Sequence, residues 1–324
     1  MVTLEQLYEP ISRELKVYRE KFEAALQHED DLLGQVLGHV RRRNGKMMRP
    51  VLVLLVAREF GTVGEAAYRS AITLELLHTA SLLHDDVVDE SNERRGQSSV
   101  NAVYDNKIAV LVGDYILSTS LEQATLTDSM RIVRRISSLG KLLSDGEVKQ
   151  IANIKNRAIS EQSYYDVISH KTAELFAACA ELGAVSSQAD ESEISDAHRL
   201  GEIIGMCFQI RDDIFDYFEG SEIGKPTGND MREGKLTLPA IHVLKTTGDK
   251  RMLDIAAKVK DGTVSHDEIG EFVDFTKKNG GIEYAEQVMD RFRNEAREIV
   301  SRYSNKAVRD ALMAYIDFVV ERKM

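Results

Sequence analysis

Apolar residues recur at three- and four-residue steps along most of the chain, which is the spacing of one face of an α-helix. The first helix is expected just after Thr3, which with Gln6 has the residue types of a capping box. No alternating pattern predicts a strand of any length. We therefore expect one all-α domain over residues 1–324. Its main helices are expected over residues 30–42, 51–58, 66–89, 108–125, 130–150, 160–185, 195–217 and 236–244, with three or four more after them.

Polar and glycine-bearing segments separate these helices. Asn44-Gly45 ends the helix that precedes it, just after three arginines, and Pro50 suits the first turn of the next helix. Residues 91–98 form a short polar loop with one glycine. The longest irregular stretch, residues 219–234, contains four glycines, one proline and several charges. A loop this long inside a compact domain is typically functional.

Composition narrows the classes of partner. The formal net charge of -11 argues against nucleic acid, because phosphate backbones select basic proteins. Cys179 and Cys207 lie in apolar surroundings and suggest buried thiols in a reducing compartment. The N-terminus lacks the apolar core of a signal peptide, and the apolar run at 51–57 is far too short to span a bilayer. We expect a cytoplasmic protein that can make transient contact with a membrane surface.

Two aspartate patterns of identical spacing are the strongest chemical signal: DDVVD at 85–89 and DDIFD at 212–216. On a helix the first and last aspartate of each share a face. Such arrays of carboxylates suit hard divalent cations such as Mg²⁺. One cluster alone could equally be a solvated helix end, but two copies in apolar settings favour binding, because buried charges need partners. The candidate ligands are Asp85, Asp86, Asp89, Asp212, Asp213 and Asp216.

Cations lie beside both patterns, mostly in glycine-bearing segments. Any one of these lysine or arginine side chains, taken alone, is most simply explained as a solvated surface charge. Together they could hold the anion that carboxylate-bound metals require, and a diphosphate fits. His78 precedes Asp85 by two helical turns on the same stripe, which makes it a further candidate. The candidate cations are Lys46, Arg49, Arg94, Arg95, Lys171, Lys225 and Lys235.

These motifs resemble those of the trans-isoprenyl diphosphate synthases, the polyprenyl synthetase family. Residues 77–89 with Arg94-Arg95-Gly96 are similar to the family's first aspartate-rich motif, and residues 208–216 to its second. Four further motifs fall in the family's order: Gly45-Lys46 with Arg49-Pro50, Gly113-Asp114-Tyr115, Lys171-Thr172-Ala173 with Leu175-Phe176, and Gly224-Lys225 with Gly234-Lys235. The resemblance implies an isoprenoid-synthase-type helical bundle around a central cavity, usually a homodimer.

The resemblance also implies roles for individual residues. The six aspartates would bind Mg²⁺, more than one ion per site, bridging an allylic diphosphate. Asp85, Asp86 and Asp212 are counted as catalytic, together with Lys171, Thr172 and Gln209. Thr172 and Gln209 would stabilise the allylic cation. Cations contacting the allylic diphosphate would be Arg94, Lys171, Lys225 and Lys235. Groups holding isopentenyl diphosphate would be Lys46, Arg49, His78 and Arg95.

Product length is expected to depend on Ala80 and Ser81, which precede Asp85 by about one turn. Short-chain relatives often place an aromatic ring there, so two small residues predict a longer product, of the kind attached to quinones. Close helix packing would also explain small residues. The alternatives are a geranylgeranyl or farnesyl diphosphate synthase, a class I terpene cyclase, and a non-catalytic synthase subunit. The intact second aspartate pattern argues against the last two.

Overall fold

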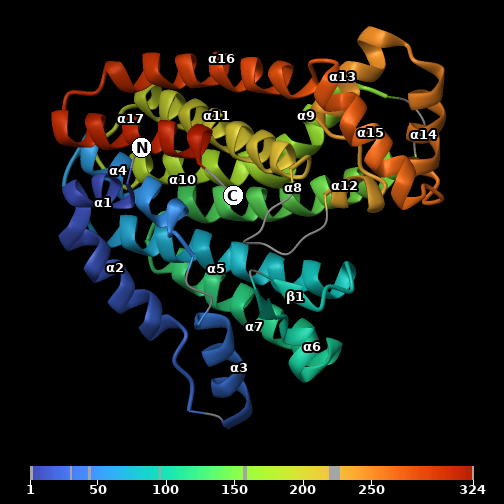
Figure 1. Cartoon of the computed structure of the whole chain (residues 1–324). Helices are drawn as coiled ribbons and strands as arrows, with labels where there is room; N and C mark the ends of the chain where they lie inside the picture. The colour runs from blue at the N-terminus through green and yellow to red at the C-terminus, as the bar shows by residue number, and fades with distance from the viewer. Residues whose placement is uncertain are drawn as a thin grey trace. The chain divides into compact units, whose positions relative to one another are not determined.

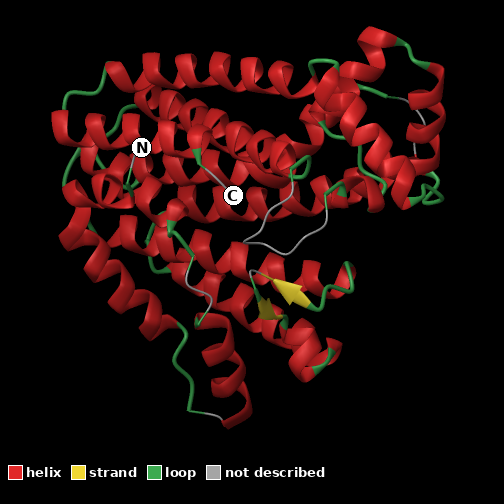
Figure 2. Ribbon diagram, viewed as in Figure 1, coloured by secondary structure: helices red, strands yellow, loops and turns green. Residues whose placement is uncertain are grey.

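The computed structural model describes residues 3–29, 31–42, 45–94, 96–155, 159–218 and 227–322, and these are predominantly helical (Figures 1 and 2). Among them, no helix combines the length and the apolar character needed to cross a membrane. The helices are α1 (Leu4–Tyr8), α2 (Ser12–Ala25), α3 (Asp31–Arg41), α4 (Met48–Phe60), α5 (Glu65–Val88), α6 (Val100–Tyr104), α7 (Asn106–Thr125), α8 (Met130–Lys155), α9 (Glu161–Ile168), α10 (Glu174–Val185), α11 (Glu191–Phe215), α12 (Asn229–Arg232), α13 (Leu238–Thr247), α14 (Lys250–Lys260), α15 (His266–Lys278), α16 (Gly281–Ser301) and α17 (Lys306–Glu321).

The chain divides into two compact units, each built from three segments. The first contains Met1–Gly140, Phe176–Gly201 and Val300–Tyr315, and the second contains Lys141–Leu175, Glu202–Ile299 and Ile316–Met324. Helices α8, α10, α11 and α17 each contribute to both units. A single domain over the whole chain stays a prediction.

In the first unit, α5 and α7 pack along each other (Figure 1). Ser120 of α7 donates a hydrogen bond to the Thr73 carbonyl of α5 at 2.9 Å. Helix α4 is buried at every position from Val51 to Ala57, which explains why its sequence is apolar all round. Dense helical packing therefore fixes α5, the helix that ends in the first aspartate cluster.

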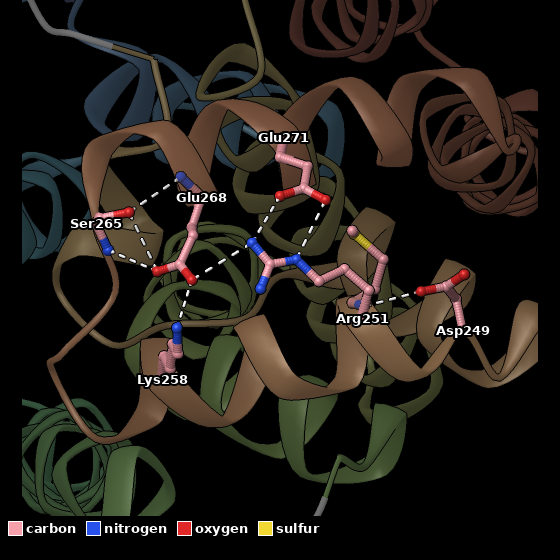
Figure 3. A network of polar contacts seen from close by, with 7 residues as sticks. Asp249, Arg251, Lys258, Ser265, Glu268 and Glu271 are labelled. Atoms are coloured by element: carbon pink, nitrogen blue, oxygen red, sulfur yellow. Dashed lines mark hydrogen bonds and ion pairs between the residues drawn. The ribbon is translucent and has the colours of Figure 1, made fainter.

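In the second unit, a surface network ties α14 to α15 (Figure 3). Glu268 accepts from the backbone N–H of Ser265 at 3.1 Å and from Lys258 at 2.5 Å. Arg251 lies 3.0 Å from Glu271 and 3.5 Å from Glu268. The hydrogen bonds from Lys258 and Ser265 lower the pKa of Glu268 to about 2, with the Lys258 hydrogen bond the largest cause.

The observed helices follow the expected ones closely. Gln6 Oε1 accepts the Thr3 backbone N–H at 2.9 Å, which confirms that half of the predicted capping box. Four helices follow α13 in the part of the chain that the structure describes, as expected. The polar loop contains a short hairpin, in which β1 (Glu93–Arg94) pairs antiparallel with β2 (Gln97–Ser98).

One expected helix, 160–185, is interrupted. A π-helical turn, η2 (Ser169–Ala173), separates α9 from α10. Two glycines give this turn its space: a Cβ at Gly205 would lie 2.5 Å from the Ala173 Cα, and one at Gly146 would lie 3.0 Å from the His170 Cβ. Single π-turns inside helices are frequently found at functional sites.

Candidate active site

The first aspartate cluster ends α5 in the first unit, and its three carboxylates differ in environment. Asp85 is partly exposed and Asp89, the C-terminal cap, is exposed. Asp86 is only 1% exposed, and its Oδ1 accepts from Arg94 Nε at 2.5 Å. The first and third aspartates therefore face solvent on one side of the helix, whereas the second anchors the β1–β2 hairpin.

The hairpin positions Arg94 next to this cluster. Gly96 has a φ of 73°, a left-handed conformation that glycine adopts without strain, and this allows the tight reversal. The Ser91 backbone N–H also donates to the Asp86 carbonyl at 2.9 Å. Arg95 lies outside the described residues. The polar loop is thus tied back onto the end of α5 through Asp86.

The second cluster ends α11 in the second unit, and its middle aspartate is again buried. Asp213 is 5% exposed. It accepts from the Tyr164 hydroxyl at 2.5 Å and from Gln209 Nε2 at 2.8 Å. Gln209 Oε1 in turn accepts from the Thr172 hydroxyl at 2.8 Å. Burial raises the pKa of Asp213 to about 7, and the two hydrogen bonds oppose this rise.

The third aspartate of this cluster holds a loop. The Asp216 carboxylate accepts the backbone N–H groups of Asn229 at 2.9 Å and Asp230 at 3.0 Å, at the start of α12. Gly228 precedes them with a φ of 76°. Burial raises the pKa of Asp216, and burial together with the charges of Asp213 and Asp216 raises the pKa of Asp230 strongly. Asp216 therefore positions the segment that leads to Lys235.

Asp212 is the most accessible carboxylate of the second cluster, with 40% of its side chain exposed. Its Oδ1 lies 2.6 Å from Nη2 of Arg322. Each cluster thus combines an accessible first aspartate with a buried, hydrogen-bonded second one.

The predicted diphosphate-binding cations are held in ion pairs within each unit. Arg94 pairs with Asp86, Lys171 with Glu147 at 2.6 Å, and Lys235 with Glu233 at 2.5 Å. The Lys171 ammonium also donates to Gln150 at 3.3 Å. Lys225 lies outside the described residues. An arriving diphosphate could therefore replace existing carboxylate partners.

The residues expected to hold isopentenyl diphosphate lie in the first unit. Lys46 is exposed before α4, where its carbonyl accepts from the Tyr8 hydroxyl at 2.9 Å. The Arg49 guanidinium lies 5.2 Å from the centre of the Phe176 ring. His78 is partly buried on α5, two turns before Asp85.

The two chain-length candidates also lie on α5. Ala80 is almost fully buried, whereas Ser81 is partly exposed and donates to the His78 carbonyl at 2.9 Å. No bulky side chain therefore projects from either position.

A cavity of about 170 Å³ lies in the second unit. The cavity is lined by candidate site residues that the sequence predicts from three separate segments. They are Lys171, Thr172, Gln209, Asp213 and Lys235. Asp230 and Tyr164 line the same cavity, with apolar walls that include Ile154, Val167 and Ile241.

Each cluster is suited to bind a divalent cation through only one or two carboxylates. Within the described ranges, no three His, Cys, Asp or Glu side chains converge into a ready-made metal cage. Mg²⁺ does not need one, because it keeps several waters and binds through one or two carboxylates plus substrate phosphates. The accessible carboxylates that would bind such ions are Asp85 and Asp89 in the first unit and, separately, Asp212 in the second.

Four residues that bear on the site escaped sequence reasoning. Tyr164 anchors Asp213, Glu147 holds Lys171, Asp230 lines the cavity and Arg322 contacts Asp212. Only Asp230 carried a signal, because it lies in the long glycine-rich loop between predicted functional residues.

Known proteins resemble the chain over nearly its whole length. The octaprenyl diphosphate synthase of Escherichia coli is 30% identical over 99% of both chains. The geranylgeranyl pyrophosphate synthase structure from Bacteroides thetaiotaomicron is 48% identical, with a TM-score of 0.87 over 98% of this chain and 99% of that one. The polyprenyl synthase structure from Caulobacter crescentus, complexed with calcium and isoprenyl diphosphate, is 27% identical, with a TM-score of 0.92 over 100% and 99%. The family model for polyprenyl synthetases matches residues 30–274, and the chain belongs to that family.

Proposed function

We propose that the chain is a Mg²⁺-dependent prenyltransferase that condenses isopentenyl diphosphate with allylic diphosphates into an all-trans polyprenyl diphosphate. The observation that carries the proposal is the repeated design of the two clusters. In both, an accessible aspartate stands beside a buried, anchored one, and cations lie nearby in exchangeable ion pairs. Membership of the polyprenyl synthetase family supports this chemistry.

Breaking the allylic C–O bond places negative charge on the leaving diphosphate. When bound, Mg²⁺ ions would neutralise part of that charge, held by Asp85 and Asp89 in the first unit and by Asp212 in the second. Lys171 and Lys235 would move away from their partners Glu147 and Glu233 and supply further positive charge at the diphosphate, where the negative charge develops. This exchange would keep both lysine ammonium groups paired with an anion.

The allylic cation must react with isopentenyl diphosphate before water can attack it. The double bond of isopentenyl diphosphate attacks the allylic cation, and a proton then leaves to the departing diphosphate. Thr172 and Gln209 would stabilise the cation with oxygen atoms of the site. Their mutual hydrogen bond at 2.8 Å, and that of Gln209 to Asp213, preorganise these oxygens.

We propose a long-chain product. Ala80 and Ser81 place no bulky side chain about one turn before Asp85, and the E. coli relative is named for an eight-unit product. A geranylgeranyl diphosphate synthase is the second candidate, because the Bacteroides structure of that name is 48% identical to this chain.

We also propose a homodimer. Val110 and Leu121 are exposed on the same face of α7, Leu111 is exposed beside them, and Val103 and Leu126 are exposed close by in sequence. Exposed apolar side chains grouped in this way mark interaction surfaces. A second copy of the chain is the proposed occupant, and light scattering on the purified protein would measure the dimer mass directly.

The experiment for the metal role replaces Asp85 with alanine. Because Asp85 is an accessible carboxylate at the end of α5, its loss should abolish Mg²⁺-dependent turnover without unfolding the protein. Asp274→Ala, which removes a carboxylate from an exposed position on α15, is the matched control and should retain turnover. Near-normal turnover by Asp85→Ala would refute the assignment.

A further inference from the structure

Arg322, directly after α17, is bound to the second aspartate cluster by several contacts within the second unit. Its Nη2 lies 2.6 Å from Asp212 Oδ1 and 2.8 Å from the Phe208 carbonyl oxygen. Its guanidinium carbon lies 3.9 Å from the centre of the Phe208 ring and 5.4 Å from that of Phe215. Arg211 Nε donates to the Arg322 carbonyl at 3.2 Å. Charge, hydrogen bonds and aromatic stacking together hold this side chain, which is 13% exposed.

The partner of Arg322 is the accessible member of its cluster. Asp213 accepts from Tyr164 and Gln209, and Asp216 accepts two backbone N–H groups. Asp212 is more accessible, with 40% of its side chain exposed, and the guanidinium lies on Oδ1, one of the two oxygens that a divalent cation could use. A guanidinium stabilises an ionised carboxylate, but two cations on one carboxylate oxygen repel each other. They therefore compete for it.

We propose that Arg322 is a positioning residue that holds and orients Asp212, and that it gives up this oxygen to Mg²⁺ when the ion binds. The inference rests on the proposed role of Asp212 as a metal ligand. It adds that the end of α17 responds to the metal, because Arg322 leaves Asp212 on exchange. A purely structural contact would fasten α17 to α11 without affecting the affinity of the cluster for a cation.

Direct metal binding distinguishes these roles. Mn²⁺, as the probe for Mg²⁺, is titrated into the full chain without substrate and followed by electron paramagnetic resonance. Arg322→Gln should bind Mn²⁺ about tenfold more tightly, because the competing charge is gone. Arg322→Lys, which keeps the charge, should stay within about threefold of the wild type. Lys306→Gln removes one charge from the other end of α17, where Lys306 pairs with Asp310, and should have no effect.

Unchanged or weaker binding by Arg322→Gln would overturn the inference, and so would a tenfold gain in Arg322→Lys. Asp212→Asn separates the inference from the proposed function. If Asp212→Asn weakens Mn²⁺ binding while Arg322→Gln matches the wild type, only the role of Arg322 is wrong. If Asp212→Asn binds Mn²⁺ normally, the metal role of Asp212 is wrong as well.

A second readout follows the end of α17 itself. The chain contains no tryptophan, so Phe318→Trp, one turn before Arg322, provides a single fluorophore. Mn²⁺ is a strong quencher, so this titration uses Mg²⁺. Mg²⁺ should shift the emission of the introduced tryptophan when Arg322 is present, and this shift should disappear when Arg322→Gln is added. A shift of equal size in both backgrounds would contradict the exchange.

Discussion

Tyr164→Phe removes one hydroxyl from the buried support of the second cluster. Asp213 has two hydrogen-bond donors, Tyr164 and Gln209, so the variant leaves one buried carboxylate oxygen without its donor. A hydrogen bond to a charged group contributes about 1.5–3 kcal/mol. We expect Tyr164→Phe to lose that amount at alkaline pH, which lowers the thermal midpoint by about 2–6 °C for a chain of this size.

The loss should depend on pH in a defined direction. Burial raises the pKa of Asp213 to about 7, above its unfolded value, so stability falls as the pH rises from the unfolded pKa towards 7. The Tyr164 hydrogen bond favours the ionised form, so its removal raises this pKa further and extends the fall to higher pH. The variant and the wild type should therefore differ most at pH 8.5 and least at pH 5.5.

Thermal unfolding followed by circular dichroism at these two pH values is the assay, with Tyr165→Phe as the control. The Tyr165 hydroxyl donates to Glu161 at 3.1 Å, and Glu161 keeps a second donor in Tyr284 at 2.6 Å. The control should therefore lose less than about 1 kcal/mol at either pH. Equal losses by both variants, or a loss by Tyr164→Phe that is independent of pH, would refute the reasoning.

Two further changes test other parts of the molecule. Ser81→Phe places a ring one turn before Asp85 and should shorten the product, as measured by reversed-phase chromatography of the dephosphorylated chains; unchanged length would count against the steric argument. The pKa of Glu268 is lowered to about 2, so its contribution is present above the unfolded pKa near 4.3 and is lost as the pH falls towards 2. Glu268→Gln should therefore be less stable than the wild type at pH 6, and the difference should be much smaller at pH 2.5, measured by urea denaturation; a constant difference would contradict this.

Helix positions could be predicted because burial imposes the helical period on the sequence. The π-turn at Ser169–Ala173 could not, because Gly205 and Gly146 create its space from other helices. The two-residue strands of the hairpin are too short to show any alternation.

The candidate residues could be predicted because their spacing is local. Their environments could not, because these depend on distant partners. Tyr164 is 49 residues from Asp213, and Arg322 is 110 residues from Asp212. Six equivalent aspartates in the sequence therefore divide in the structure into accessible carboxylates and structural anchors.

Turnover by the purified protein alone is the most direct test of the proposed function. Labelled isopentenyl diphosphate is supplied with dimethylallyl, geranyl, farnesyl or geranylgeranyl diphosphate, with Mg²⁺ or with a chelator, and the products are sized after dephosphorylation. We predict linear products longer than C20 that form only with the metal. Products that stop at C20 would establish the geranylgeranyl synthase instead. No product from any primer would contradict the prenyltransferase assignment for the isolated chain.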